Sequence, residues 1–137
     1  MADAGHKVEK SDEDWRAQLS PEAYQVLRRA GTERAWSGEY VDWHGDGTFS
    51  CRACGNPLFA STTKYESGSG WPSFWEPLSS DAVELAEDRS HGSVRVEVRC
   101  ARCSSHLGHV FDDGPAPTGQ RFCMNSLALK VEEPAAE

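Results

Sequence analysis

The apolar positions near the start of the chain repeat at spacings of three and four residues, the period of a helix that packs on one face. The repeat is formed by Ala23, Val26, Leu27 and Ala30. Ser20 can cap the start of this helix, Pro21 suits its first turn, and Gly31 suits its end. A shorter helix is predicted just before it, because Ser11 and a run of acids precede Trp15. The pattern therefore predicts a helical segment packed on the domain that follows.

Beyond this segment the pattern changes to an alternation of apolar and polar residues, which is typical of strands with one buried face. The clearest example is 94–99, where three valines alternate with charged residues. Residues 83–87 fit either a strand or a helix. Other strands are predicted over 38–44, 48–51 and 120–131, the first two joined by a turn at Asp46-Gly47. We therefore expect a mainly β fold of antiparallel strands with a short N-terminal helical segment.

Length and charge narrow the class of protein. The 137 residues fit one domain, which we expect over 11–131, with a disordered start at 1–10 and a flexible tail at 132–137. No apolar run approaches the ~18 residues of a membrane helix, and no secretory signal is visible, so we expect a cytoplasmic protein. The net charge of −8, from 14 basic and 22 acidic residues, argues against nucleic acid or an anionic membrane as partner.

The five cysteines divide into two C-x-x-C pairs and one single residue. The pairs are Cys51 with Cys54 and Cys100 with Cys103. Two such pairs supply the four thiolates of a tetrahedral zinc site, which leaves no open position for a substrate and therefore stabilises the fold. Two local disulfides, a redox-active pair or bound iron are the alternatives. We predict structural zinc, because the pairs have equal spacing and both adjoin predicted strands.

The single cysteine, Cys123, lies in the run Arg121-Phe122-Cys123-Met124-Asn125. On a strand, residues two apart share a face, so Arg121, Cys123 and Asn125 are predicted to project together. A neighbouring cation favours the nucleophilic thiolate. The alternative is a buried, inert cysteine, but three polar or reactive groups on one face are unusual for a packed core.

Two further motifs carry candidate chemistry. His106 and His109 are three apart, so they lie on opposite faces of a regular strand unless the segment bends, and Gly108 between them permits a bulge. Imidazoles beside a thiolate suit proton donation, although both can also be surface groups or neighbours of the metal. Trp71, preceded by Gly68-Ser69-Gly70, offers a rigid apolar surface for a methyl or thioether group, or it packs on the core. The other four tryptophans, Trp15, Trp36, Trp43 and Trp75, are interpreted as structural.

Together these motifs resemble one family closely, the peptide-methionine (R)-S-oxide reductases known as MsrB. The resemblance covers about residues 20–131. It includes Gly68-x-Gly70-Trp71-Pro72-Ser73-Phe74, Ser105-His106-Leu107-Gly108-His109-Val110-Phe111 and Arg121-Phe122-Cys123-Met124-Asn125-Ser126, in order with both C-x-x-C pairs. Several long motifs in the right order are specific to the family.

The resemblance implies a fold of two antiparallel sheets, called a β-tent, and zinc held by the four paired cysteines. It implies that Cys123 attacks the sulfoxide sulfur, and that His106, His109 and Asn125 help to protonate the departing oxygen. Arg121 would hold the charge and geometry of the site, with Asp112 nearby. Trp71 would line the pocket for the substrate methyl group, with Phe111 and Phe122 as further wall. The product is methionine and a sulfenic acid on Cys123.

One position departs from a common pattern of this family. Many members carry a second, resolving cysteine between the glycines before the tryptophan, where this chain has Ser69, natural or engineered. A serine forms no disulfide, so an external thiol is expected to regenerate Cys123, either thioredoxin or a small thiol with glutaredoxin. The expected substrate is oxidised methionine in proteins, and also free, and the expected state is a monomer.

Two other classes of protein compete with the reductase. A zinc-stabilised β-tent that only binds a ligand would need the four paired cysteines and an aromatic pocket, but not a fifth thiol between Arg121 and Asn125. A nucleic-acid-binding zinc ribbon is disfavoured by the net charge. We therefore predict a reductase.

Overall fold

Two short helices open the part of the chain described by the computed structural model, which covers residues 10–89 and 92–132. They are α1 (Asp12–Gln18) and α2 (Pro21–Arg29). The predicted caps are present, because the side chains of Ser11 and Ser20 each accept a backbone N–H from the first turn of their helix. The left-handed residue that ends α2 is Ala30, with a φ of 55°, rather than the glycine that follows it. Both predicted helices are confirmed.

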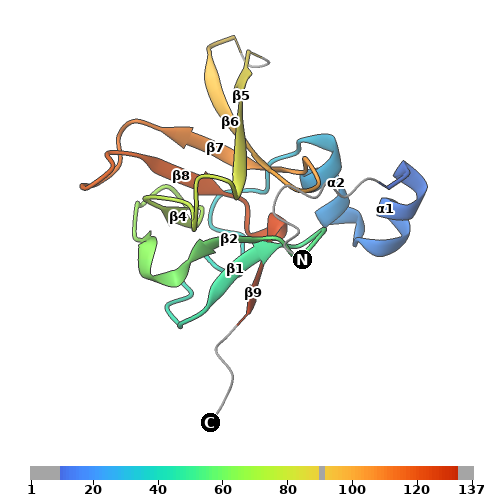
Figure 1. The fold of residues 1–137 in the computed structure, drawn as a ribbon, viewed down its shortest axis with the longest axis horizontal. Helices are drawn as coiled ribbons and strands as arrows, with labels where there is room; N and C mark the ends of the chain where they lie inside the picture. The colour runs from blue at the N-terminus through green and yellow to red at the C-terminus, as the bar shows by residue number, and fades with distance from the viewer. Residues whose placement is uncertain (1–9, 90–91, 133–137) are drawn as a thin grey trace.

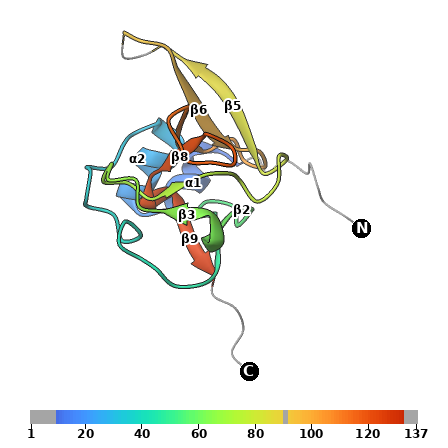
Figure 2. The ribbon, with the colours of Figure 1, turned by 90° about the vertical axis from the view of Figure 1, so that its left-hand side faces the viewer.

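Antiparallel strands form two sheets, as predicted. The three-stranded sheet has the order β2 (Pro57–Ala60), β1 (Thr48–Cys51), β9 (Leu129–Glu132). The six-stranded sheet has the order β3 (Lys64–Tyr65), β4 (Ser73–Phe74), β8 (Arg121–Met124), β7 (His106–Phe111), β6 (Arg95–Cys100), β5 (Val83–Asp88). Two 3₁₀ turns are η1 (Ser61–Thr63) and η2 (Ser126–Ala128). The segment that fitted either type is therefore strand β5, whose hairpin with β6 projects from the body of the molecule (Figures 1 and 2).

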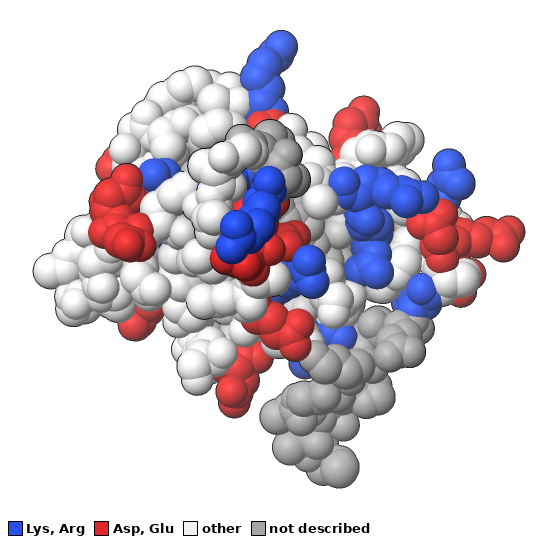
Figure 3. All heavy atoms as spheres, turned by 90° about the horizontal axis from the view of Figure 1, so that it is seen from above, with Lys and Arg blue, Asp and Glu red and all other residues white. Residues whose placement is uncertain are grey.

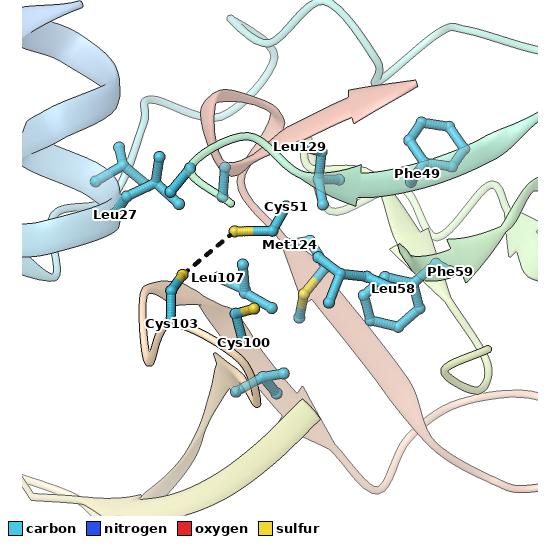
Figure 4. Packing of buried hydrophobic residues seen from close by; sticks show 14 of the residues in the cluster. Leu27, Phe49, Cys51, Leu58, Phe59, Cys100, Cys103, Leu107, Met124 and Leu129 are labelled. Carbon is cyan, nitrogen blue, oxygen red and sulfur yellow. Dashed lines mark hydrogen bonds between the residues drawn. The ribbon is translucent and has the colours of Figure 1, made fainter. Parts of the chain in front are cut away.

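Aromatic side chains join the two sheets in the core. Phe59 on β2 stacks on Phe74 of β4 with ring centroids 4.5 Å apart, and Phe49 on β1 meets the same ring edge-on at 5.1 Å. Buried Leu27 and Met124 extend the core toward α2 and β8 (Figure 4). The helices therefore close one end of the two-sheet body, where Figure 1 places them.

Two predicted strands differ from the structure. The segment 38–44 forms turns, with a bond from the Val41 N–H to the Gly38 oxygen, and buries Tyr40 against the core. The predicted strand 120–131 is interrupted by η2 and divides into β8 and β9, which belong to different sheets. This break matters for function because it follows Asn125 directly.

Two other expectations concern the chain ends and one tryptophan. Most of 1–10 and of the tail 132–137 lies outside the described residues, but Lys10 sits 5.1 Å over the Trp15 ring and β9 includes Glu132. Trp36, interpreted as structural, is 62 % exposed and lies outside the core. Its backbone N–H instead donates to the Gly70 oxygen at 2.7 Å, which holds it beside the loop that carries Trp71.

Candidate active site and metal centre

Cys123 lies in the middle of the six-stranded sheet and faces a cavity. Strand β8 is paired with β4 on one side and β7 on the other, which places Ser73 and His109 directly opposite Cys123. The cavity has a volume of about 290 Å³. It is lined by Thr32, Ser69, Trp71, Arg95, Gly108, His109, Phe111, Arg121, Cys123 and Asn125. The predicted convergence of Arg121, Cys123 and Asn125 is therefore found in the structure.

The protonation of Cys123 reflects a balance between burial and polar neighbours. Burial raises the pKa of the Cys123 thiol above its ordinary value. Hydrogen bonding from Ser69 and the charge of Arg121 lower this pKa, as the sequence predicted for a neighbouring cation, but they only partly offset the burial. In the absence of substrate the protonated thiol therefore predominates at neutral pH.

Three serine hydroxyls form a chain that ends at this thiol. Ser69 Oγ lies 3.8 Å from Cys123 Sγ and 2.8 Å from Ser67 Oγ, which is in turn 2.8 Å from Ser73 Oγ. Ser73 is fully buried, so it anchors the chain against the sheet. The serine at the expected position of a resolving cysteine is thus in contact with the sulfur, as a polar group.

Arg121 is held in place by two neighbours. Its guanidinium makes two bonds to the Asp113 carboxylate, at 2.8 and 3.1 Å, and lies 4.5 Å over the Phe111 ring. The acid that meets Arg121 is therefore Asp113, while Asp112, which the resemblance placed near the site, is exposed. Arg121 keeps its positive charge beside the sulfur in this arrangement.

A β-bulge brings the two histidines together. The pairing of β6 with β7 slips between Val98 and Arg99, so that Leu107 is an extra residue, and the rings of His106 and His109 lie 5.4 Å apart. Gly108 is required here because a Cβ would lie 2.1 Å from the Cys123 oxygen. The predicted bulge is confirmed.

The two histidines differ in their position relative to the cavity. His109 lines it and bonds through Nε2 to Asp88 at 2.8 Å, whereas buried His106 bonds through Nδ1 to Glu97 at 2.7 Å. Burial lowers the pKa of His106, so this ring is neutral near pH 7. Its Nε2 has no hydrogen-bond partner among the described residues. His109 is thus the histidine beside Cys123, with His106 packed behind it.

The amide of Asn125 is oriented by bonds at both of its ends. Its Oδ1 accepts the Glu33 backbone N–H at 3.0 Å and its Nδ2 donates to the Leu107 oxygen at 3.1 Å. Because an amide nitrogen carries two hydrogens, the second N–H remains as a donor at the wall of the cavity. The buried Glu33 carboxylate accepts the Ser126 and Leu127 N–H groups, both at 2.9 Å, which fixes the turn that follows Asn125.

Aromatic rings form the apolar walls of the cavity. Trp71 lines it and donates its indole N–H to the Glu33 oxygen at 3.0 Å, so its ring is fixed from outside the cavity. Phe111 is a second wall, as predicted. Phe122 points away, because adjacent strand residues face opposite sides, and it packs in the core 5.7 Å from Phe59. Its predicted place in the pocket wall is corrected accordingly.

The other four cysteines gather at a different place, where the two sheets meet. Their sulfur atoms all lie within 4.8 Å of one another, with 3.7 Å between Cys51 and Cys103 (Figure 4) and 3.5 Å between Cys54 and Cys100. A disulfide would require about 2.05 Å, whereas zinc bound tetrahedrally by thiolates separates the sulfurs by about 3.8 Å. Four thiolates at this spacing repel one another, so the deprotonated cluster requires a cation. The cluster therefore fits zinc.

Polar groups around the cluster hold its sulfurs and loops. The Arg102 N–H points at Cys100 Sγ from 3.4 Å, and Ser105 Oγ lies 3.0 Å from Cys103 Sγ. Arg28 of α2 donates to both Ser105 Oγ and the Cys103 oxygen, at 2.9 and 2.8 Å. The helical segment is thereby fastened directly to the second C-x-x-C pair.

Sequence reasoning missed the acids and the threonine that complete the site. Thr32 and Arg95 line the cavity, while Asp88, Glu97 and Glu33 hold the two histidines and the turn after Asn125. One signal was available for two of them, since Arg95 and Glu97 both lie at alternating positions of an evident strand. The others depend on tertiary pairing, which no local pattern reveals.

The described residues include no helix long and apolar enough to cross a membrane. Basic and acidic side chains are intermingled over the face that carries the β5–β6 hairpin (Figure 3).

Comparison with known proteins gives a consistent result. The family model described as SelR domain matches residues 19–133. A protein of Thiobacillus denitrificans named peptide methionine sulfoxide reductase MsrB is 58 % identical over 88 % of this chain and 91 % of its own length. A protein of Methanosarcina mazei with the same name is 57 % identical over 92 % of this chain and 90 % of its own length. The chain therefore belongs to the SelR-domain family of the MsrB methionine sulfoxide reductases.

Proposed function

We propose that this chain reduces methionine R-sulfoxide, in proteins and in free form, to methionine at Cys123. The observation that carries the proposal is the position of the Cys123 sulfur, in the wall of a cavity that combines aromatic rings with an arginine and an amide. The names of its relatives support the same reaction. Repair of oxidised proteins in the cytoplasm, by a monomeric enzyme, is the biological role proposed.

The first half of the reaction transfers oxygen from the substrate to the enzyme. The Cys123 sulfur bonds to the sulfoxide sulfur and the substrate oxygen takes up a proton. The sulfur–oxygen bond of the substrate then breaks, the hydroxyl bonds to the Cys123 sulfur, and the new sulfur–sulfur bond breaks with its electron pair staying on methionine. The products are methionine, reduced by two electrons, and a Cys123 sulfenic acid, oxidised by two electrons. Arg121 lowers the pKa of the attacking thiol and so supplies part of its activation.

Different residues of the cavity wall hold the methyl group and the oxygen of the substrate. Trp71 and Phe111 enclose the methyl group that the sulfoxide carries, which fits a thioether better than a charged group. His109 and the second amide hydrogen of Asn125 protonate or bind the departing oxygen, and His106 positions the His109 ring from behind. Only one epimer can place its methyl group and its oxygen on these two sides together.

The second half of the reaction requires a thiol from outside the chain. Ser69 touches the Cys123 sulfur but cannot form a disulfide with it, and the other four thiols lie together in the cluster. Thioredoxin, or a small thiol with glutaredoxin, therefore attacks the sulfenic acid and forms a mixed disulfide with Cys123 as water leaves. A second thiol then forms a disulfide with the first and releases Cys123 as the free thiol.

The proposed cofactor is one zinc ion held by Cys51, Cys54, Cys100 and Cys103. Zinc with four thiolate ligands supplies structural stability rather than Lewis acid chemistry, because it has no open coordination position. Its role would be to join the end of β1 in one sheet to the end of β6 in the other.

A single-turnover experiment tests the proposed activity. The chain is mixed with a methionine sulfoxide epimer mixture, without added reductant, and methionine is quantified. We expect about one equivalent of methionine per chain, formed from the R epimer only, and none with Cys123→Ser. Undiminished methionine formation by that variant would contradict the assignment of the nucleophile. No methionine from the unaltered chain would favour the binding module instead.

A further inference from the structure

A second cavity lies behind the serine that touches Cys123. It has a volume of about 460 Å³ and is lined by residues of the β3 end, the Ser67–Ser69 loop and the turn after β7. Ser69 and Arg121 line both this cavity and the one that faces Cys123. The Cys123 sulfur therefore lies next to the wall between two cavities, and Ser69 Oγ is the part of that wall 3.8 Å from it.

The two cavities differ in the chemistry of their walls. The first holds the rings of Trp71, Phe111 and His109, as described above. The second is polar: Tyr65, Glu66, Ser67 and Asp113 line it along with the two shared residues. The Tyr65 hydroxyl is buried and has no hydrogen-bond partner within the described part of the chain. A thioether suits the first cavity, and a polar molecule suits the second.

The direction from which a thiolate attacks a sulfenic acid indicates what the second cavity is for. A thiolate displaces hydroxide by donating electrons into the sulfur–oxygen antibonding orbital, whose outer lobe lies opposite the oxygen. In the proposed reaction the oxygen arrives from the first cavity, where His109 and Asn125 receive it. The attacking sulfur must then approach from the other side of Cys123, where Ser69 Oγ lies with the second cavity behind it.

The loop that carries Ser69 has room to move aside for such an attack. Gly68 and Gly70 flank the serine with φ angles of 75° and 93°. No atom lies within 4 Å of the place where a Cβ on Gly68 would be, so this side of the loop is not packed. The Gly70 end of the loop is held by the Trp36 N–H, so the movement is confined to the Gly68 side, where an incoming sulfur displaces the Ser69 hydroxyl from its contacts with Ser67 and the Trp71 oxygen.

We propose that the second cavity binds the thiol that reduces the Cys123 sulfenic acid, and that it selects a small thiol with a neutral or positively charged body. The inference rests on the proposed function. In the first step the thiol sulfur bonds to Cys123 Sγ and the hydroxyl leaves as water with the thiol proton. In the second step another thiol of the same class forms a disulfide with the first and returns Cys123 to the thiol.

The charges that face the cavity are the basis of this selection. Among the residues that line the cavity, Glu66 and Asp113 contribute two carboxylates, and the cation Arg121 is bonded to Asp113. Close to Glu66 lie Lys64, whose Nζ donates to the Val41 oxygen at 3.2 Å, and Asp42, which add one charge of each sign. His44 also contacts the Glu66 carboxylate, with its Nε2 3.4 Å away. An anionic thiol therefore meets net repulsion at the entrance, and a cationic one meets attraction.

The test compares matched small thiols in the reduction step alone. The chain is oxidised with one equivalent of methionine R-sulfoxide and then mixed with cysteamine, 2-mercaptoethanol or 3-mercaptopropionate, each at the same thiolate concentration. The Cys123 mixed disulfide is quantified by mass spectrometry of acid-quenched samples. We expect cysteamine to react about tenfold faster than 3-mercaptopropionate at low ionic strength, and less so in salt.

Two variants separate local charge from overall charge. Glu66→Arg should remove or reverse the preference, whereas Glu132→Arg on the other sheet makes the same change in net charge and should keep it. Rates are expressed relative to the unaltered chain for each thiol, so that intrinsic nucleophilicity cancels. Equal effects of both variants, or no preference in the unaltered chain, would overturn the inference.

The outcome is distinguishable from a failure of the proposed function. Methionine release in the first step is measured in the same samples, and it should be unchanged by Glu66→Arg because this residue does not line the first cavity. If the first step fails, the sulfenic acid is generated with hydrogen peroxide instead, and the thiol comparison is carried out on that species. The second cavity is then tested independently of the substrate.

Discussion

The four clustered cysteines and Cys123 use the same side chain in opposite surroundings. The cluster sulfurs face one another at the ends of β1 and β6, and what neutralises them must lie between them. The Cys123 sulfur lies in the middle of a sheet, faces a cavity and has Arg121 and Ser69 as neighbours. Position in the sheets therefore decides whether a thiol closes a metal site or remains open to a substrate.

The largest expected effect is a difference in stability between a variant of a cluster cysteine and a variant of Cys123. Cys51→Ser should lose zinc and destabilise the fold by more than about 3 kcal/mol, because the ligand joins the two sheets. Cys123→Ser should keep its zinc and change the free energy of unfolding by less than about 1 kcal/mol. Thermal unfolding and elemental analysis measure both quantities. Equal destabilisation by the two substitutions would contradict the division.

A smaller loss of stability is expected when Glu33, the buried acid that binds the turn after Asn125, is substituted. Glu33→Gln removes one acceptor from the buried pair of N–H groups that begin η2, which costs about 1–3 kcal/mol. The rate of methionine formation should fall as well, since the turn that follows Asn125 loosens. The exposed pair of Glu39 with Arg52 supplies the control, because Glu39→Gln should cost less than about 0.5 kcal/mol. Chemical denaturation of the three proteins compares these values.

The Glu33 carboxylate also explains why the break between β8 and β9 was not predicted. The apolar pattern of 120–131 is continuous enough for one strand, and the two N–H groups that interrupt it are bound by an acid more than 90 positions earlier. By contrast, the caps of both helices were predicted because Ser11 and Ser20 act on their own first turn. Local patterns therefore predicted the elements, and tertiary partners decided where a long one ends.

The candidate site divides in the same way. The convergence of Arg121, Cys123 and Asn125 followed from strand periodicity, and the four ligand cysteines from their spacing. Placing Phe122 in the pocket ignored that periodicity, since it alternates with its two neighbours. Neither Asp88 nor the polar second cavity was foreseen, because both arise from segments that meet only in the folded chain.

A rate effect of about tenfold is expected from the acid behind His109. Asp88→Asn should weaken the bond that orients the imidazole at Nε2 and slow the first half of the reaction, with a changed pH profile of the single-turnover rate. Glu87→Gln on the same strand, whose carboxylate pairs with exposed Arg89 at 3.0 Å, serves as the control. An unchanged rate and pH profile in Asp88→Asn would show that His109 needs no positioning partner.

The smallest expected effect is the shift of a titration midpoint. Alkylation of Cys123 by iodoacetamide should increase with pH, with a midpoint above that of a free cysteine, because burial raises its pKa. Ser69→Ala should raise the midpoint further, since the Ser69 hydroxyl lowers the pKa. The cluster cysteines should react only after chelation of zinc. A Cys123 midpoint below that of free cysteine would contradict the balance described above.

Native mass spectrometry of the chain after one turnover tests most directly whether Cys123 reacts with the substrate while the four clustered cysteines hold zinc. The zinc-loaded chain is treated with methionine R-sulfoxide without reductant, and its mass and the oxidised residue are determined. The account predicts that one zinc ion is retained and that one oxygen atom is added at Cys123. Loss of zinc together with a disulfide between Cys123 and a cluster cysteine would contradict it.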